Sequence, residues 1–437
     1  MNRATIAGGA FASNLLLALA AGRCAPERDA DLAATTSPVT TSSTADAHDG
    51  LLYGRVTTED GAIYEGRLRF GGDEEALWGN YFNGFKAENP WVAHAPPDRL
   101  PRERSSIDVF GFEIGVTSRF DGGRPFMARF GDIARLEARG RDLWVTLKSG
   151  TVFHLDRYAA DDYADGVRVW DGSRGVVDLG ERQIRSIEFV TAAQLGSGPS
   201  PLYGTVRTRQ GEFTGFVQWD RKACLGSDEL IGHTADGEVR LRFDAIRRVA
   251  RRSDRGALVT LLDGREVVLS DTRPDGRGNS GMYVDDPRYG RVLISWQAFE
   301  RIDFAPGGAS PAYADFPAGR ALTGTVTTRS GRHLAGWLVY DLDESETTAT
   351  LDAPAHGVDY TILFGLIASV VPAGAGAAGA QRATVTLHSG EELQLESGGD
   401  LGAWNAGILI FVDGPGRAEY VPWSDVERIE FERAAGM

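Results

Sequence analysis

Asp and Glu are the most abundant side chains in this chain that could act in catalysis, with 61 among 437 residues. Two carboxyl groups about 5 to 9 Å apart could act as acid and base, or as acid and nucleophile, in glycoside hydrolysis. Glu88 and Glu113 form one candidate pair, since both belong to a segment rich in aromatic residues. A carbohydrate-active hydrolase with two carboxylates near this segment is therefore an alternative function.

Other catalytic and metal-binding patterns are missing from the sequence. The histidines form no H-E-x-x-H pair, and no G-x-S-x-G sequence marks a nucleophile. The segment "DGRGNSG" (275–281) lacks the alternating carboxylates of a calcium loop. Cys224 has no indicated base and no partner for a disulfide, so it is interpreted as a small loop or core residue. We predict no catalytic residue, no metal and no cofactor.

A run of arginines, "RLRFDAIRRVARRSDR", stands out in a chain of net charge −15. One hypothesis is an exposed patch that binds a polyanion, a lipid headgroup or an acidic partner. The other is a solvated strand face, with Phe243, Ile246 and Val249 turned inward and the arginines paired with carboxylates. The net negative charge argues against nucleic acid, which needs cations opposite its phosphates. The candidates for anion binding are Arg240, Arg242, Arg247, Arg248, Arg251, Arg252 and Arg255.

Aromatic and amide side chains gather in a second segment, residues 78–126. Such side chains suit carbohydrate or protein partners. The alternative is that this segment folds over its neighbours and that its aromatic residues form a small core of their own. The candidates for partner binding are Trp78, Asn80, Tyr81, Phe82, Asn83, Phe85 and Trp91.

The elements that must position these residues repeat three times along the chain. "LYGRVTTEDGAIYEGRLRF" begins at Leu52, "LYGTVRTRQGEFTGFVQWD" at Leu202 and "LTGTVTTRSGRHLAGWLVYD" at Leu322. A second phrase, V-T-L-x-x-G, follows each of them, and each copy closes on I-x-F. Residues 78–126 are an insertion in the first copy, and insertions on repeat scaffolds often carry binding residues.

The repeated phrases are typical of β-hairpins. Polar and β-branched residues alternate around Val56, Val206 and Val326, as they do in half-buried strands. The glycine that follows supplies the backbone conformation that closes a tight turn. We therefore predict an all-β protein, and interpret these glycines as turn residues rather than phosphate ligands.

Each copy also looks doubled. A strand, a glycine turn, a bent strand and a closing I-x-x-[IV] strand resemble small Sm-like or SH3-like barrels. The resemblance implies three tandem repeats, each a pair of small barrels or half-barrels. Sm-like folds often bind RNA, but the acidic charge opposes that here. The predicted division is a signal peptide (1–22), a disordered Ser/Thr-rich tether (23–50), repeat 1 (51–190) with its insertion (78–126), repeat 2 (202–304) and repeat 3 (320–431).

The N-terminus is typical of an export signal. A basic start at Arg3 precedes an apolar stretch, and Ala18-Leu19-Ala20 offers small residues at the cleavage positions. A retained membrane anchor is the alternative. Cys24 is a lipidation candidate because it resembles a bacterial lipoprotein acylation site, although Arg23 replaces the small residue expected before the cysteine.

Together these features predict an exported protein of the periplasm or cell envelope, with or without a lipid anchor. We expect a non-catalytic binding or scaffold protein, whose partner is an unidentified protein or glycan of the envelope. Nothing in the sequence indicates a homo-oligomer. The alternatives are the carbohydrate-active hydrolase and a polyanion or lipid-headgroup binder acting through the arginine run.

Overall fold

The computed structural model describes residues 50–71, 74–96, 107–109, 112–114, 124–192, 200–270, 279–307, 310–372, 382–402, 404–412 and 417–433. For residues 107–109, 112–114 and 161, only the backbone is described. The chain divides into residues 1–41 and residues 42–437, and every described residue belongs to the second unit. The predicted signal peptide, Cys24 and all but the last residue of the tether lie outside the described residues.

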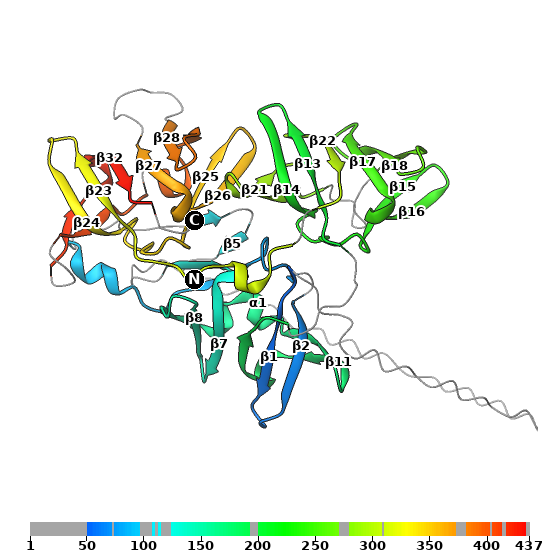
Figure 1. Ribbon diagram of the computed structural model, residues 1–437, viewed down its shortest axis with the longest axis horizontal. Coiled ribbons are helices and arrows are strands. Elements are labelled where there is room, and N and C mark those ends of the chain that lie inside the picture. The colour runs from blue at the N-terminus through cyan, green and yellow to red at the C-terminus, as the bar shows by residue number, and fades with distance from the viewer. Residues whose placement is uncertain are drawn as a thin grey trace, which may run out of the picture. The chain divides into compact units, whose positions relative to one another are not determined.

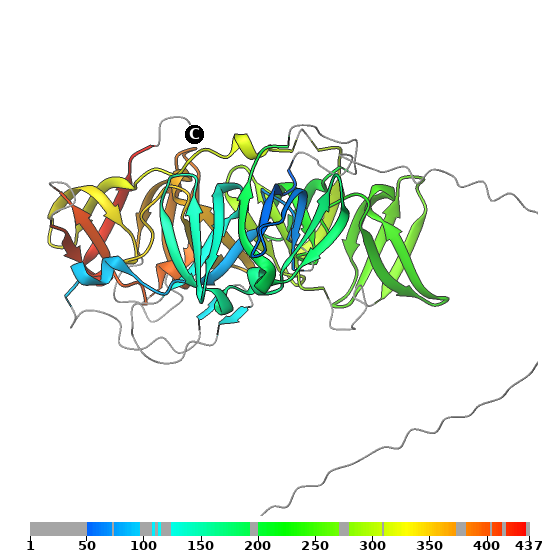
Figure 2. The same ribbon diagram turned by 90° about the horizontal axis from the view of Figure 1, so that it is seen from below.

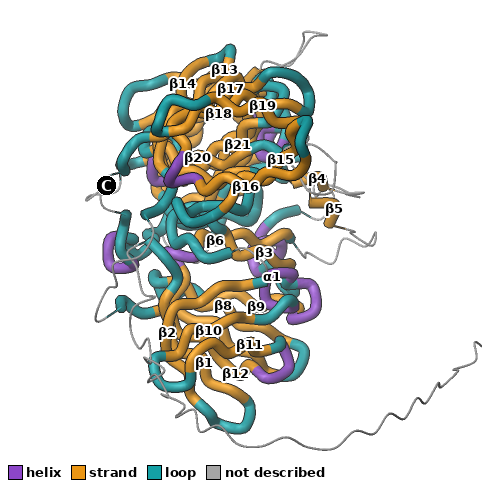
Figure 3. Tube along the Cα trace, turned by 90° about the vertical axis from the view of Figure 1, so that its right-hand side faces the viewer, coloured by secondary structure: helices purple, strands orange, loops and turns teal. Residues whose placement is uncertain are grey.

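Strands dominate this second unit and confirm the all-β prediction (Figure 3). Repeat 1 contains β1 (Tyr53–Thr58), β2 (Ile63–Phe70), β3 (Tyr81–Phe85), β4 (Ile107–Val109), β5 (Phe112–Ile114), β6 (Pro125–Arg129), β7 (Ile133–Arg139), β8 (Asp142–Leu147), β9 (Val152–Asp156), β10 (Val167–Asp171), β11 (Gly175–Leu179) and β12 (Ile184–Phe189). Within the described residues, the single α-helix is the short α1 (Asp161–Ala164). No helix of the described part is long and apolar enough to cross a bilayer.

Repeats 2 and 3 are built from strands in the same succession. Repeat 2 contains β13 (Tyr203–Thr208), β14 (Gly211–Trp219), β15 (Glu229–Thr234), β16 (Gly237–Arg242), β17 (Ile246–Arg251), β18 (Gly256–Leu261), β19 (Glu266–Ser270), β20 (Met282–Asp286), β21 (Gly290–Ile294) and β22 (Phe299–Phe304). Repeat 3 contains β23 (Thr323–Thr328), β24 (His333–Val339), β25 (Thr350–Ala355), β26 (Val358–Leu363), β27 (Ile367–Val371), β28 (Arg382–Leu387), β29 (Glu392–Glu396), β30 (Ile408–Phe411), β31 (Glu419–Val421) and β32 (Val426–Phe431).

Short 3-10 helices connect several of these strands. They are η1 (Pro90–His94), η3 (Phe130–Asp132), η4 (Arg157–Ala159), η5 (Glu181–Gln183), η6 (Phe243–Ala245), η7 (Tyr313–Asp315), η8 (Phe364–Leu366), η9 (Gly399–Leu401) and η10 (Trp423–Asp425). Among them, η3, η6 and η8 occupy the same place in their repeats, and each begins on a buried phenylalanine.

The three repeats share one strand order. The sheet of repeat 1 runs β11-β10-β2-β1-β12-β7-β8-β9, that of repeat 2 includes β21-β20-β14-β13-β22-β17-β18-β19, and that of repeat 3 runs β31-β30-β24-β23-β32-β27-β28-β29. The first strand of each repeat pairs with its last, so that the glycine of L-x-G lies opposite the closing phenylalanine, as Gly204 does opposite Phe304. Each repeat therefore forms one continuous antiparallel ladder, and its division into paired Sm-like or SH3-like barrels stays a prediction.

The hairpin after the second strand is what differs between repeats. In repeat 2, β15 and β16 extend their own sheet by pairing with β19. In repeat 3, β25 and β26 join the neighbouring repeat, because β26 pairs with β21 (Figure 1). In repeat 1, β3 and β6 form a separate two-stranded ladder. The extra residues of repeat 1 therefore lie between β3 and β6, which is a narrower stretch than the predicted insertion 78–126.

Two glycines of each repeated phrase are required by close backbone approach. A Cβ on Gly215 would lie 1.9 Å from the carbonyl oxygen of Asp285 in β20, and one on Gly66 would lie 1.9 Å from that of Trp170 in β10. A Cβ on Gly324 would lie 2.1 Å from the carbonyl oxygen of Glu430. The hairpin glycines have a different role, since Gly61 and Gly331 take φ angles of 85° and 82° in their turns. The repeated glycines are thus explained by the fold.

Candidate functional site

The aromatic residues of the predicted binding segment pack inside the protein. Trp78, Tyr81 and Phe82 are 1%, 3% and 0% exposed. Trp78 packs against Phe216 of repeat 2 with ring centroids 5.0 Å apart, and Phe82 contacts the ring of Phe130 in its own repeat. All three rings therefore lie in the protein interior, and Trp78 belongs to the contact between repeats 1 and 2. Their role in binding a partner stays a prediction.

The remaining members of that set also have neighbours within the chain. Asn80 is buried, and its Oδ1 accepts a hydrogen bond from Gln218 Nε2 of repeat 2 at 2.9 Å. The backbone N–H of Asn83 donates to Asp162, and Phe85 is half-buried on β3. Trp91 lies on η1 and packs against Trp337 of β24 with ring centroids 5.2 Å apart. The light-blue η1 can be seen beside the yellow β24 in Figure 2.

Two buried ion pairs join the ends of the long β3–β6 connection to repeat 3. Lys86 Nζ donates to Asp343 Oδ1 at 2.6 Å, and Arg124 Nη1 donates to Asp341 Oδ2 at 3.1 Å. The side chains of both pairs are at most 11% exposed. Buried charges of this kind need partners, because an unpaired charge in the interior is very costly. The connection is therefore fixed to repeat 3 at both of its ends.

A cavity of about 650 Å³ lies beside these ion pairs. Its walls come from β6, the turns after β14 and β24, and β25, so that all three repeats contribute. Eight carboxylates and three basic side chains line it. The carboxylates are Asp132, Asp341, Asp343, Glu344, Glu346, Asp352, Asp359 and Asp400, and the basic residues are Lys86, Arg124 and Arg221.

Local backbone geometry presents the acidic residues to the cavity. Asp341 and Leu342 have φ angles of 49° and 55°, which makes the turn after β24 tight. Asp341 Oδ1 also accepts the backbone N–H of Ala406, which anchors the turn to the segment before β30. The same pattern occurs in repeat 2, where Asp220 Oδ1 accepts the N–H of Ser280 at 2.7 Å. The turn therefore holds the next carboxylates, from 343 to 346, at fixed positions in the cavity wall.

Burial shifts the protonation of two cavity carboxyls. The pKa of Glu344 is raised well above its ordinary value by burial, then by the neighbouring charges of Asp343, Asp400 and Asp341, while Lys86 lowers it. Burial raises the pKa of Asp352 to about 6. Burial therefore favours the protonated form of Glu344, beside carboxylates that are paired with Lys86 and Arg124. Neighbouring carboxyls in different protonation states are a feature of acid–base sites.

Glu344→Gln is expected to stabilise the protein in a pH-dependent manner. Glutamine mimics the protonated acid, and an acid whose folded pKa is raised loses stability as pH rises above its unfolded pKa of about 4.3. Parent and variant should therefore have equal free energies of unfolding below about pH 4, and the variant should gain progressively above it. Urea unfolding at pH 4, 6 and 8 measures this. A variant that is less stable at pH 8 would show that Glu344 is ionised in the folded protein.

The predicted anion-binding arginines are mostly paired with carboxylates of the same repeat. Arg242 contacts Asp244, Arg248 contacts Asp303 and Arg251 contacts Asp254. Arg240 contacts both Glu229 and Glu238, while Arg247, Arg252 and Arg255 are exposed. Phe243, Ile246 and Val249 are buried, at 2%, 2% and 0% exposure. These contacts match the solvated strand face, and a role in anion binding stays a prediction.

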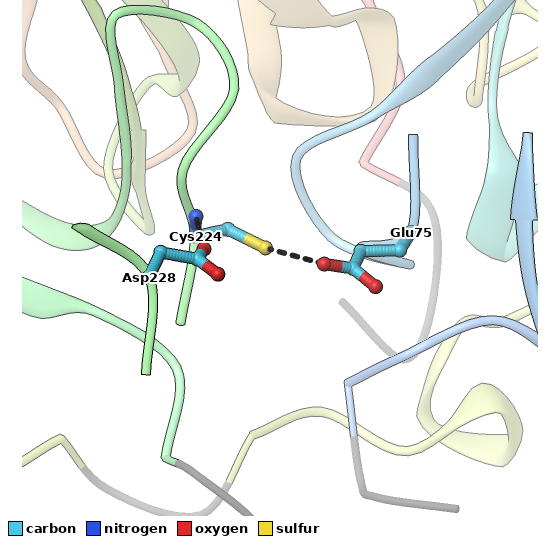
Figure 4. A group of neighbouring side chains, drawn as sticks. All are labelled: Glu75, Cys224 and Asp228. Carbon is cyan, nitrogen blue, oxygen red and sulfur yellow. Dashed lines mark hydrogen bonds between the residues drawn. The ribbon is translucent and has the colours of Figure 1, made fainter. Parts of the chain in front are cut away.

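Cys224 belongs to a small buried group with Glu75 and Asp228, whose donor atoms lie within 4.8 Å of one another (Figure 4). Each member already has a hydrogen-bonding role. The Cys224 thiol donates to Glu75 at 3.8 Å, Asp228 accepts the N–H of Cys224 at 2.9 Å, and Glu75 pairs with Arg67. Burial raises the pKa of the thiol well above its usual value, whereas metal binding and nucleophilic attack need the thiolate. The group is best explained as a polar contact between repeats 1 and 2.

The carboxylate pair expected from the sequence is not the group that lines the cavity. Glu88 is exposed on the segment between β3 and η1 and does not line the cavity, and the side chain of Glu113 lies outside the described residues. Glu344, Glu346 and Asp352 were missed by sequence reasoning. The signal that could have found Glu344 and Glu346 is the acidic stretch "DLDESE" at 341–346, at the end of the repeated glycine phrase.

Comparison with protein-family models, with curated proteins and with solved structures gives no match for this chain. The cavity and the residues around it are therefore the features from which a function is inferred.

Proposed function

We propose that this protein is a non-catalytic, exported binding or scaffold protein of the cell envelope, and that its ligand occupies the cavity between the β3–β6 hairpin and repeat 3. The observation that carries the proposal is a cavity of about 650 Å³ walled by segments far apart in the sequence. Ligand pockets commonly have about 300 to 1,000 Å³ and lie where domains or repeats meet. Export rests on the N-terminal sequence alone.

The rigidity of the cavity walls supports a binding role. Lys86 and Arg124 are fixed by buried ion pairs, and Glu346 Oε1 accepts a hydrogen bond from Ser149 Oγ at 3.0 Å. Walls that are already ordered lose little conformational entropy when a ligand binds. The extra residues of repeat 1 would then serve to complete a pocket, rather than to present aromatic side chains on the surface.

A cavity-filling substitution tests the proposal. Ser345 lines the cavity, so Ser345→Trp should occupy much of it, while Ser389→Trp in the exposed turn after β28 is the matched control. Isothermal titration calorimetry would use spermidine, chitotetraose and a heparin tetrasaccharide as probes. We expect at least one probe to bind the parent and the control, and to bind Ser345→Trp at least 10-fold more weakly. If no probe binds, or if all bind the three proteins equally, the cavity is not the binding site.

A second candidate is glycoside hydrolysis, which is favoured by Glu344, whose pKa burial raises, beside the carboxylates of Asp343 and Asp341. A neutral acid can protonate a leaving oxygen, and a neighbouring carboxylate can act as base or nucleophile. This reaction predicts that chitotetraose or another glycan releases new reducing ends, and that Glu344→Gln abolishes the release. Bound but intact oligosaccharide would support the binding protein instead.

A further inference from the structure

We infer that the cavity takes an aliphatic organic cation, with amino or guanidino groups on a flexible methylene chain. The inference deepens the proposed function and rests on it, because it names the chemical class of the ligand at the same site. A free polyamine and the side chain of a basic peptide share this chemistry.

The unsatisfied hydrogen-bonding atoms of the cavity indicate that its ligand is a hydrogen-bond donor. Among the described residues that line it, three buried oxygens have no hydrogen-bond partner: Glu344 Oε2, Glu346 Oε2 and Asp352 Oδ1. No described donor in the lining is left unsatisfied in this way. Glu346 is only 9% exposed, so its free oxygen is largely removed from bulk water. Buried polar atoms are nearly always paired in native proteins, and carboxylate oxygens such as those of Glu346 and Asp352 can be paired only by an N–H or O–H group.

The charges of the lining point in the same direction. Three of the lining carboxylates are already paired with a basic residue: Asp343 with Lys86, Asp341 with Arg124 and Asp132 with Arg129. Glu346 and Asp352 each keep a buried oxygen without a hydrogen-bond partner. An anionic ligand would place further acceptors and negative charge beside these oxygens. A neutral sugar brings acceptors together with its donors. A cation supplies donors without acceptors and balances the charge.

The spacing of the carboxylates favours an organic cation over a metal ion. In the part of the chain that the structure describes, the one group of three acidic, histidine or cysteine donors within 4.8 Å is Glu75, Cys224 and Asp228, outside the cavity. Calcium needs six to eight oxygens at about 2.3 to 2.6 Å from the ion. The cavity carboxylates are too dispersed for that, whereas separate amino groups on one chain can reach separate carboxylates.

Apolar residues on the remaining wall fit the methylene part of such a ligand. Phe126, Leu147 and Leu293 line the cavity and are 3%, 8% and 8% exposed. Phe126 and Phe153 already accept a cation, because the ammonium of Lys86 lies 5.8 and 5.0 Å from their ring centroids. Methylene chains pack on such rings while their ammonium groups reach the carboxylates.

The test uses calorimetry in 150 mM salt with spermidine and with the peptide acetyl-Lys-Lys-amide, and chitotetraose as the neutral comparison. The variant Glu344→Gln/Glu346→Gln replaces two carboxyl groups that each have an unsatisfied oxygen, and the exposed Glu88→Gln is the matched control. We expect a cationic probe to bind the parent and Glu88→Gln equally, and the double variant at least 10-fold more weakly. Binding by spermidine alone identifies a free amine, and binding by the peptide alone identifies a basic side chain.

Proton release provides a second readout that surface binding would not give. A cation beside Glu344 favours its ionised form, so binding should release a proton, seen as a buffer-dependent enthalpy in phosphate and Tris at pH 7. The groups facing Glu344 are Asp341, Asp343, Asp400 and Lys86.

Cation binding that the double variant does not weaken overturns the inference. Chitotetraose binding that Ser345→Trp abolishes, without cation binding, overturns it while leaving the proposed function intact. If no probe binds, both proposals fail.

Discussion

Arg124→Met is expected to lower the free energy of unfolding by about 3 to 5 kcal/mol, because it leaves the carboxylate of Asp341 buried without its cation. The two side chains are only 6% and 5% exposed, and their atoms are 3.1 Å apart. Methionine retains much of the arginine side-chain volume, so the loss reports mainly the unpaired charge. Chemical denaturation at pH 7 measures it.

The matched control is Arg55→Met, which breaks an ion pair with Glu65 in which both side chains are 44% exposed. Exposed pairs contribute about 0 to 1 kcal/mol, so this variant should be nearly neutral. The double variant Arg124→Met/Asp341→Asn should recover most of the loss, since asparagine can still accept the N–H of Ala406 and carries no charge. Equal losses in Arg124→Met and Arg55→Met would show that the β3–β6 connection is not fixed to repeat 3 as described.

Gly215→Ala is expected to cost about 3 kcal/mol or more, because the new methyl group cannot be accommodated without moving a neighbouring strand. Its Cβ would lie 1.9 Å from the carbonyl oxygen of Asp285, and that oxygen belongs to the backbone of β20, so no rotamer change relieves the clash. The shift should also disturb the pairing of β20 with β21. Thermal and urea unfolding of the variant give the cost.

Gly172→Ala is the control, because a Cβ on Gly172 meets nothing within 4 Å. It should change stability by less than about 0.5 kcal/mol, as surface substitutions usually do. A second comparison is Gly61→Ala, where space is open but φ is 85°, and there the cost should be about 1 kcal/mol. If Gly215→Ala lowered the free energy of unfolding no more than Gly61→Ala does, close contact with β20 would not explain the glycine at position 215.

The fold class could be predicted because it is encoded in local patterns. Alternating residues around Val206 and the hairpin glycines specify strands and turns without any knowledge of distant contacts. The two close-contact glycines could be seen as repeated but not explained, since the reason for Gly215 lies in β20, far along the chain. The extent of the extra segment was also hidden, because among the described strands β3 pairs only with β6, and it carries no repeated phrase.

The cavity could not be predicted for a related reason. Glu344 and Asp352 belong to repeat 3, while Lys86 and Arg124 belong to repeat 1, and only the folded chain brings them together. The raised pKa of Glu344 likewise depends on burial by residues from elsewhere. The sequence offered 61 acidic residues with no means of ranking them. The sequence led instead to a prediction that aromatic residues bind a partner, and two of them, Trp78 and Phe82, are buried.

The pairing of β26 with β21 determines where the chain can be cut into fragments that fold on their own. The hairpin β25–β26 belongs to repeat 3 by sequence, yet its hydrogen bonds complete the sheet of repeat 2. A cut in the 305–319 linker would leave β21 with an open edge, a surface prone to intermolecular aggregation. The three copies are therefore not interchangeable modules. A fragment that ends after repeat 2 is therefore expected to aggregate.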